Sequence, residues 1–190
     1  MKRSTLVLTL LALAAPTIGA TTVYAAAEQT MMVGGHAMYP SKNIIANAVN
    51  SKDHTTLVAA VKAAGLVDTL SGPGPFTVFA PTNAAFNALP AGTVETLLKP
   101  ENKSMLTKVL TYHVVPGSHD SASLRSAILA GGGKASLKTV AGGTLTFMMN
   151  GSNNIVVRDE KGDVANIVTY DVAQSNGEIF SIDTVLMPAG

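Results

Sequence analysis

Residues 77–86 read Thr-Val-Phe-Ala-Pro-Thr-Asn-Ala-Ala-Phe, and this stretch decides the fold because it joins a strand to a helix. The apolar run over 76–79 predicts a strand, because β-branched and aromatic side chains suit a pleated sheet. Pro81 fixes φ at about −65° and turns the chain. Thr82 or Asn83 can then accept a hydrogen bond from the free N–H groups of a helix that carries Phe86.

Helical patterns come early in the sequence and strand patterns come late. Leu57, Ala60, Val61 and Ala64 follow helical spacing, and Gly65 is placed to end that helix. Further helices are predicted over 106–110 and 121–130, whereas strands are predicted over 112–115, 144–149, 155–157, 164–169 and 179–187. In the last of these strands, a period of two places Phe180, Ile182 and Leu186 on one face and Asp183 on the other. Such segregation favours a single α+β domain over a doubly wound parallel sheet.

The composition excludes several classes of function. The chain has 190 residues, of which 47% are hydrophobic and only 13% charged, so one packed domain is expected. It has no cysteine, which excludes disulfides, thiolate nucleophiles and iron–sulfur clusters. A net charge of +1 without dense basic runs argues against a nucleic-acid partner. The sequence has no tryptophan and few aromatic residues, so a stacking platform for bases or sugars is not expected.

The N-terminus has the pattern of a secretory signal peptide. Lys2 and Arg3 precede a short apolar run over 6–15, and small residues allow cleavage after Ala25 or Ala27. An uncleaved membrane anchor is the alternative, but this run is only about half the ~20 residues that a spanning helix needs. We therefore predict a signal peptide over 1–25, a flexible N-terminal arm over 26–42 and a domain over 43–190. The protein is expected to be exported, periplasmic or extracellular, with no membrane span after cleavage.

Cleavage also changes the charge of the chain. Removal of Lys2 and Arg3 from the thirteen basic residues leaves eleven, against twelve acidic residues, and a net charge of −1. The mature chain is therefore expected to be close to neutral.

Three separated segments together resemble the fasciclin domain. They are 77–86, then Tyr-His-Val-Val-Pro-Gly over 112–117, then Asn-Gly-Glu-Ile-Phe-Ser-Ile-Asp-Thr-Val-Leu-Met-Pro over 176–188. Their order and spacing resemble those of single-domain secreted bacterial members, over about residues 43–188. The resemblance implies a wedge-shaped β-sandwich with helices packed around it, an α+β fold. One departure is Glu178-Ile179-Phe180, where the family usually has an aliphatic residue, isoleucine and histidine. Any role of that histidine is absent here.

The resemblance implies a non-enzymatic binding or cell-adhesion module that recognises protein or carbohydrate at the cell surface, without a cofactor, as a monomer or weak homo-oligomer. Tyr112 and His113 match a Tyr-His region that is linked to integrin binding in animal members. Asp171-Val172 resembles the Asp-Ile pair of the animal adhesive motif. The alternatives are a structural histidine hydrogen-bonded near the core and an exposed loop aspartate before a strand.

A second hypothesis is a periplasmic copper or small-ligand carrier. Met31, Met32, His36 and Met38 offer thioether and imidazole ligands, which suit Cu(I), although the methionines can also pack on the domain. A small ligand could instead use a pocket near Tyr112 and His113. A hydrolase is disfavoured, because the sequence has no G-x-S-x-G, H-E-x-x-H or S-x-x-K motif.

Overall fold

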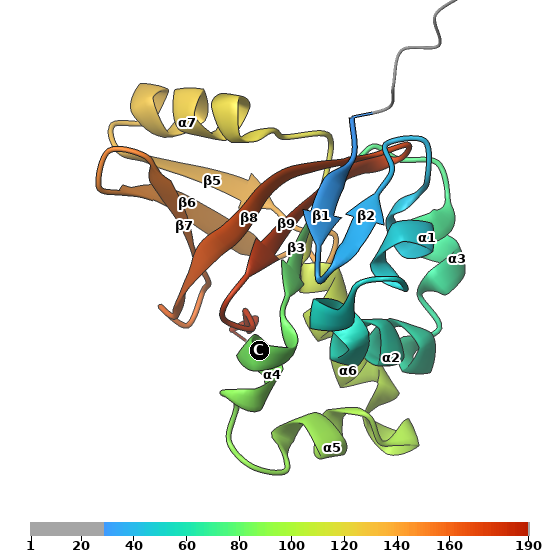
Figure 1. Ribbon diagram of the computed structural model, residues 1–190. Coiled ribbons are helices and arrows are strands. Elements are labelled where there is room, and N and C mark those ends of the chain that lie inside the picture. The colour runs from blue at the N-terminus through green and yellow to red at the C-terminus, as the bar shows by residue number, and fades with distance from the viewer. Residues whose placement is uncertain (1–28, 190) are drawn as a thin grey trace, which may run out of the picture.

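A mixed β-sheet that curls nearly into a barrel organises the computed structural model, which describes residues 29–189 (Figure 1). Its strands are β3 (Phe76–Pro81), β4 (Val114–Pro116), β5 (Lys134–Lys138), β6 (Thr144–Asn150), β7 (Asn154–Arg158), β8 (Val164–Gln174) and β9 (Gly177–Ile182). The spatial order is β4-β3-β9-β8-β7-β6-β5, and only the β3–β9 pair is parallel. The two edge strands, β4 and β5, come close to each other. The amide of Val140, two residues after β5, donates to the carbonyl of Val114 in β4 at 2.8 Å.

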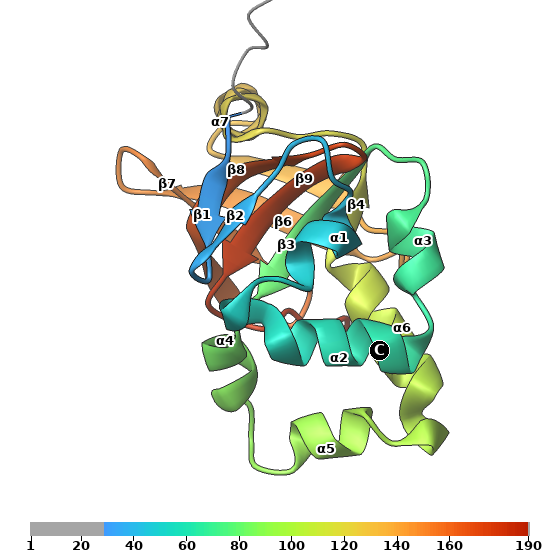
Figure 2. The same cartoon turned by 45° about the vertical axis from the view of Figure 1, so that its right-hand side comes forward.

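The helices fall into two groups. They are α1 (Ile44–Ala48), α2 (Thr55–Ala64), α3 (Val67–Ser71), α4 (Asn83–Asn87), α5 (Thr93–Leu97), α6 (Lys103–Tyr112) and α7 (Ser121–Ala130), with short 3₁₀ turns over Lys52–His54 and Pro100–Asn102. The first six gather on one side of the sheet, while α7 lies alone beside β5 and β6 (Figures 1 and 2). The α+β, single-domain expectation is thereby confirmed.

Two apolar clusters form the core. One lies inside the curled sheet, where the Phe79 ring stacks on Phe180 at a centroid distance of 5.4 Å and meets Phe147 at 5.2 Å. Leu124 and Ile128 of α7 close this cluster. The other lies between the sheet and the helices α1 to α6. Phe180, which stands where the resemblance predicts a histidine, therefore serves packing.

The strand-to-helix corner has the predicted form. Thr82 is the N-cap of α4, and its hydroxyl accepts from the Ala85 amide at 3.3 Å. Asn83 has a different role, because its carbonyl oxygen accepts from the Thr56 amide at 3.0 Å and its side-chain nitrogen donates to the Lys52 carbonyl at 2.8 Å. The corner thus also fixes the start of α2, which ends before Gly65 at φ 74° as expected.

Three element boundaries differ from the predictions. Tyr112 ends α6 instead of opening a strand, so β4 begins at Val114. The last strand stops at Ile182, and its final four residues are buried without alternation, because it pairs with neighbours on both edges and packs on both faces. In contrast, β8 runs on to Gln174 through an irregular register between Thr169 and Val172.

The N-terminal arm is ordered where the structure describes it. β1 (Met31–Val33) and β2 (His36–Met38) form an antiparallel hairpin, and Val33 and Met38 enter the helical core. These residues are therefore regular rather than irregular, while the flexibility of the arm stays a prediction. The predicted signal peptide over 1–25, with cleavage after Ala25 or Ala27, lies outside the described residues. Within 29–189, the structure has no helix long and apolar enough to cross a membrane.

Candidate binding site

Tyr112 is a buried residue whose hydroxyl group connects three elements through hydrogen bonds. Its hydroxyl donates to the Thr144 carbonyl at 3.0 Å and accepts from the Glu160 amide at 3.0 Å. These bonds join the end of α6 to the start of β6 and to the turn after β7. Burial raises the pKa of Tyr112 to about 12, so the phenol stays protonated.

His113 holds the C-terminal segment. Its Nδ1 donates to the Val109 carbonyl at 2.8 Å, and its Nε2 accepts from the Leu186 amide at 3.0 Å. This pattern requires the neutral imidazole with its proton on Nδ1. Burial lowers the pKa of His113 to about 4, against smaller opposing effects of the Val109 carbonyl and of Asp159.

Tyr112 and His113 therefore do not form a recognition surface. Tyr112 is 0% exposed and His113 only 2%, so a partner cannot reach either side chain in this fold. The structural interpretation of His113 accounts for both ring nitrogens, and the adhesive assignment of the pair is corrected.

Removal of the Tyr112 hydroxyl measures how much its two hydrogen bonds stabilise the fold. Tyr112→Phe is expected to reduce the free energy of unfolding by about 1–3 kcal/mol, because the Glu160 amide and the Thr144 carbonyl lose a buried partner. Urea unfolding followed by circular dichroism checks it. Tyr39→Phe, at a ring that is 37% exposed, is the control and is expected to unfold within about 0.5 kcal/mol of the parent. Equal effects of the two changes would contradict the role of Tyr112.

Asp171 and Val172 are structural as well. Asp171 has φ 54°, a left-handed conformation that aspartate tolerates better than most residues. Its carboxylate accepts from the Ser121 amide at 2.6 Å and from the Ser121 hydroxyl at 2.5 Å, so it fixes the start of α7. Val172 is 2% exposed. Asp171 is half-buried within β8 rather than in an exposed loop, and an adhesive role of the pair stays a prediction.

The hairpin separates the four predicted copper ligands only in part. Its register places Met31 opposite Met38, on the side that also carries His36, and places Met32 on the other side. The Met38 side chain is buried in the core, whereas His36 is exposed. No group of three or more histidines and carboxylates within residues 29–189 is placed to hold a metal ion. The geometry gives the copper carrier no support.

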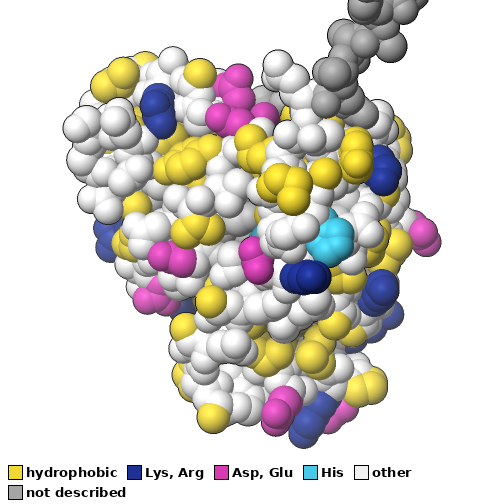
Figure 3. Space-filling model, viewed as in Figure 1, with side chains coloured by type: hydrophobic (Ala, Val, Ile, Leu, Met, Phe, Trp, Pro, Cys, Tyr) yellow, Lys and Arg dark blue, Asp and Glu magenta, His cyan; other side chains and the backbone are white. Residues whose placement is uncertain are grey.

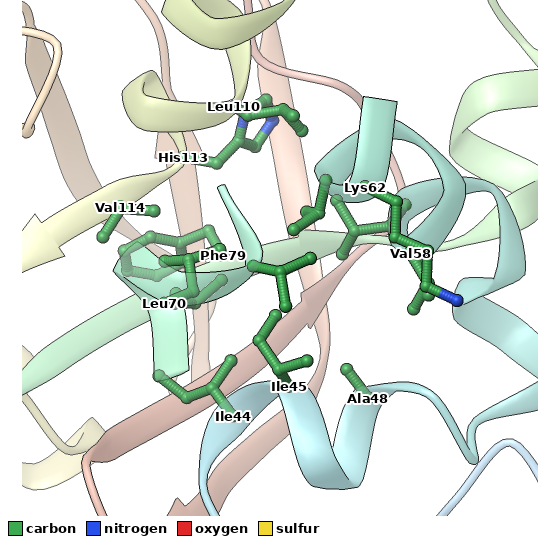
Figure 4. A pocket seen from close by; sticks show the side chains of 14 residues that line it. Ile44, Ile45, Ala48, Val58, Lys62, Leu70, Phe79, Leu110, His113 and Val114 are labelled. Atoms are coloured by element: carbon green, nitrogen blue, oxygen red, sulfur yellow. The ribbon is translucent and has the colours of Figure 1, made fainter. Parts of the chain in front are cut away.

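An apolar cavity lies beside His113, between α1, α2, α3 and β3 (Figure 4). Its volume is about 40 Å³, and Ile44, Ile45 and Leu70 point into it while the Lys62 amine lies at its edge. An engineered cavity that holds benzene has about 150 Å³. This space is too small for a carrier site and is better described as imperfect packing.

A second apolar cavity of about 30 Å³ lies beneath the hairpin and shares Ile44 and Leu57 with the first. His54 lines it, with Nδ1 2.8 Å from the Ser51 hydroxyl and with no hydrogen-bond partner for Nε2 among the described residues. Burial lowers the pKa of His54, which favours the neutral ring. The small-ligand hypothesis gains no pocket of useful size here.

What remains available for recognition is the outside of the domain. Figure 3 shows apolar side chains gathered around the β1–β2 hairpin. Met31, Met32 and Tyr39 are 38%, 63% and 37% exposed. Met31 and Met32 point to opposite sides of β1, and we use the name hairpin face for the exposed surface of residues 31–39 that carries these three side chains. The Lys42 amine lies 4.7 Å from the centre of the Tyr39 ring. The sequence singled out the two methionines, but as metal ligands rather than as a contact surface.

The comparisons agree with this fold. A profile of the fasciclin domain matches residues 52–188, and the chain belongs to that family. Protein sll1483 of Synechocystis sp. is 47% identical over 163 residues, which cover 85% of this chain and 82% of that protein. The immunogenic protein MPB70 of Mycobacterium bovis is 37% identical, over 87% of this chain and 78% of that one. The cell surface glycolipoprotein MPB83 of the same species is 33% identical, over 92% and 74%.

A solved structure supports the fold. The structure of a FAS1 domain pair from the insect cell adhesion molecule fasciclin I matches with a TM-score of 0.56 and 22% identity. The match covers 69% of this chain and 43% of that chain. The chain thus holds a fasciclin domain in which Tyr112 and His113 lie inside the fold.

Proposed function

We propose that the protein is an exported, non-enzymatic binding module that attaches to protein or carbohydrate at the cell surface. The family of the chain and the name of the glycolipoprotein relative support a location outside the cytoplasm, periplasmic or extracellular. The observation that carries the proposal is the hairpin face, because three large apolar side chains remain exposed within residues 31–39, and exposed apolar residues close together in the chain favour an interaction site. Methionine suits such a face, since its flexible thioether adapts to different partners.

A paired substitution tests the hairpin face in the native cell. Met31→Ser/Met32→Ser is expected to reduce surface attachment and aggregation to the level of the gene deletion, and to abolish cross-linking to a surface partner. The fold is expected to persist, because both side chains are already exposed. Attachment counts and cross-linked products, compared with the parent strain, measure the result.

The matched control is Met105→Ser/Leu129→Ser, which removes two side chains that are 55% and 75% exposed at other sites. It is expected to leave attachment unchanged. A deletion strain that attaches and aggregates like its parent, together with no captured partner, would remove the adhesive proposal. Equal losses in the two double variants would remove the assignment to the hairpin face.

A further inference from the structure

The outward side of β5, β6 and β7 combines cations with hydroxyl groups. On β5, Lys134, Ser136 and Lys138 are exposed, while the residues between them turn inward. Ser136 pairs with Thr146 of β6, which in turn pairs with Arg158 of β7. We call the residues Lys134, Ser136, Lys138, Thr146 and Arg158 the outer strand face.

The sheet sets the spacing of these charges. Lys134 and Lys138 are four residues apart on one strand, so their Cα atoms are separated by about 13 Å. Arg158 lies two strands away from β5, which corresponds to about 10 Å. Lys134 and Arg158 line a groove of about 400 Å³ together with Lys161 from the turn after β7, whereas Lys138 lies outside this lining. The strands hold the three backbone positions rigidly.

The carboxylates in this groove already have partners. Asp159 accepts from the backbone amides of Lys161, Asp163 and Met187 at 2.9–3.0 Å. Glu160 accepts from the amides of Thr144 at 2.9 Å and Ala189 at 3.3 Å. Backbone dipoles therefore offset part of their negative charge, and the side chains of the outer strand face remain exposed or half-buried at the rim.

We propose that the outer strand face binds a linear polysaccharide that carries carboxylate or sulfate groups, an inference that goes beyond the proposed function and adds a second binding surface away from the hairpin face. Side chains whose Cα atoms lie about 10–13 Å apart can each engage a different charge of a repeating polymer. Ser136 and Thr146, whose hydroxyl oxygens lie 3.4 Å apart, can donate to and accept from sugar hydroxyls.

Two other partners fit this face less well. The groove lining contains no aromatic residue, although buried aromatic anchors carry most protein–protein interfaces. Nucleic-acid binding requires a denser basic footprint, and single strands also require stacking side chains. A charged carbohydrate needs neither.

Titration of the mature protein with defined polymers tests the inference. Polygalacturonate and dextran sulfate are expected to bind, and neutral dextran to give no signal in calorimetry. A galacturonate oligomer is expected to bind at least tenfold more tightly than the monosaccharide, because it engages several cations at once. Higher salt is expected to weaken binding. Poly-glutamate or single-stranded DNA binding as tightly as polygalacturonate would overturn the choice of polysaccharide.

Variants then locate the site. Lys134→Gln/Lys138→Gln/Arg158→Gln is expected to weaken polygalacturonate binding at least tenfold. The control Lys52→Gln/Lys62→Gln/Lys99→Gln removes the same charge from exposed positions on the helical side and is expected to change binding less than twofold. Circular dichroism confirms that both fold. Equal losses in the two variants, or no binding of any charged polysaccharide, would overturn the inference.

The two proposals fail separately. A protein that attaches to cells through the hairpin face, but binds no charged polysaccharide, would leave the proposed function in place and remove only this inference. If the Met31→Ser/Met32→Ser variant still bound polysaccharide and its cells attached like the parent, this inference would stand and the assignment to the hairpin face would be removed.

Discussion

Replacing Gly177 with alanine is expected to lower the free energy of unfolding by more than about 3 kcal/mol. Gly177 begins β9 at φ 152° and lies opposite Phe76 in the parallel pair. An added Cβ would stand 1.9 Å from the Phe76 carbonyl oxygen and 2.8 Å from its carbon. Those atoms belong to the backbone, so β3 and β9 must separate to relieve the overlap. Urea unfolding of the parent and the variant measures the loss.

Gly151 provides the matched control. It has φ 74°, in the turn after β6, and no atom lies within 4 Å of an added Cβ. Gly151→Ala is therefore expected to cost only the strain of the left-handed conformation, about 1 kcal/mol. If the two variants lost the same stability, the close approach of β3 and β9 would not be the cause.

The parts of the fold that were predictable are those with local causes. The corner at Pro81 and Thr82 depends on a fixed φ and on a hydroxyl three residues before the amide it accepts from. The end of α2 depends on Gly65, which adopts φ 74° without steric cost. Such devices act within a few residues, so the sequence around them is sufficient.

Pairing between distant residues was not predictable in the same way. β1 and β2 have only three residues each, and they exist because they pair with each other and because Val33 and Met38 pack on the core. The alternation over Lys134–Lys138 has the period of a strand, but it covers only five residues directly after Gly131, Gly132 and Gly133. Both of the surfaces assigned here depend on these unpredicted strands.

The candidate site shows the same limit. In the sequence alone, Tyr112 and His113 are equally compatible with an exposed binding site and with buried side chains that hydrogen-bond to the backbone. What decides between them are Thr144, Glu160 and Leu186, which lie between 32 and 73 residues further along the chain. A family motif therefore identified the fold here, while the surface that it leaves exposed had to be found in the structure.

Acid is expected to destabilise the protein through His113. Its folded pKa of about 4 lies below the ordinary value of 6.5, so the unfolded chain takes up the proton first. Stability is therefore fully present above pH 6.5 and is lost as the pH falls toward 4, by about 3 kcal/mol in total. His54, whose pKa is also lowered by burial, adds to the loss. Glu178, whose pKa is raised by burial and by Asp171, opposes it at the acid end.

His113→Gln isolates this contribution, because an amide does not titrate. The variant is expected to be about 2–4 kcal/mol less stable at pH 7, since the Leu186 amide and the Val109 carbonyl lose an ideally placed partner. Its free energy of unfolding, measured from pH 7 to 4, is expected to fall less steeply than that of the parent, by up to about 1.4 kcal/mol per pH unit. His36→Gln, at an exposed imidazole of the hairpin, is the control and is expected to follow the parent curve. The Nε2 atom of His113 can accept from the Leu186 amide only while the ring is neutral. If the free energy of unfolding of His113→Gln fell with pH as steeply as that of the parent, protonation of another group, and not of His113, would cause the loss of stability in acid.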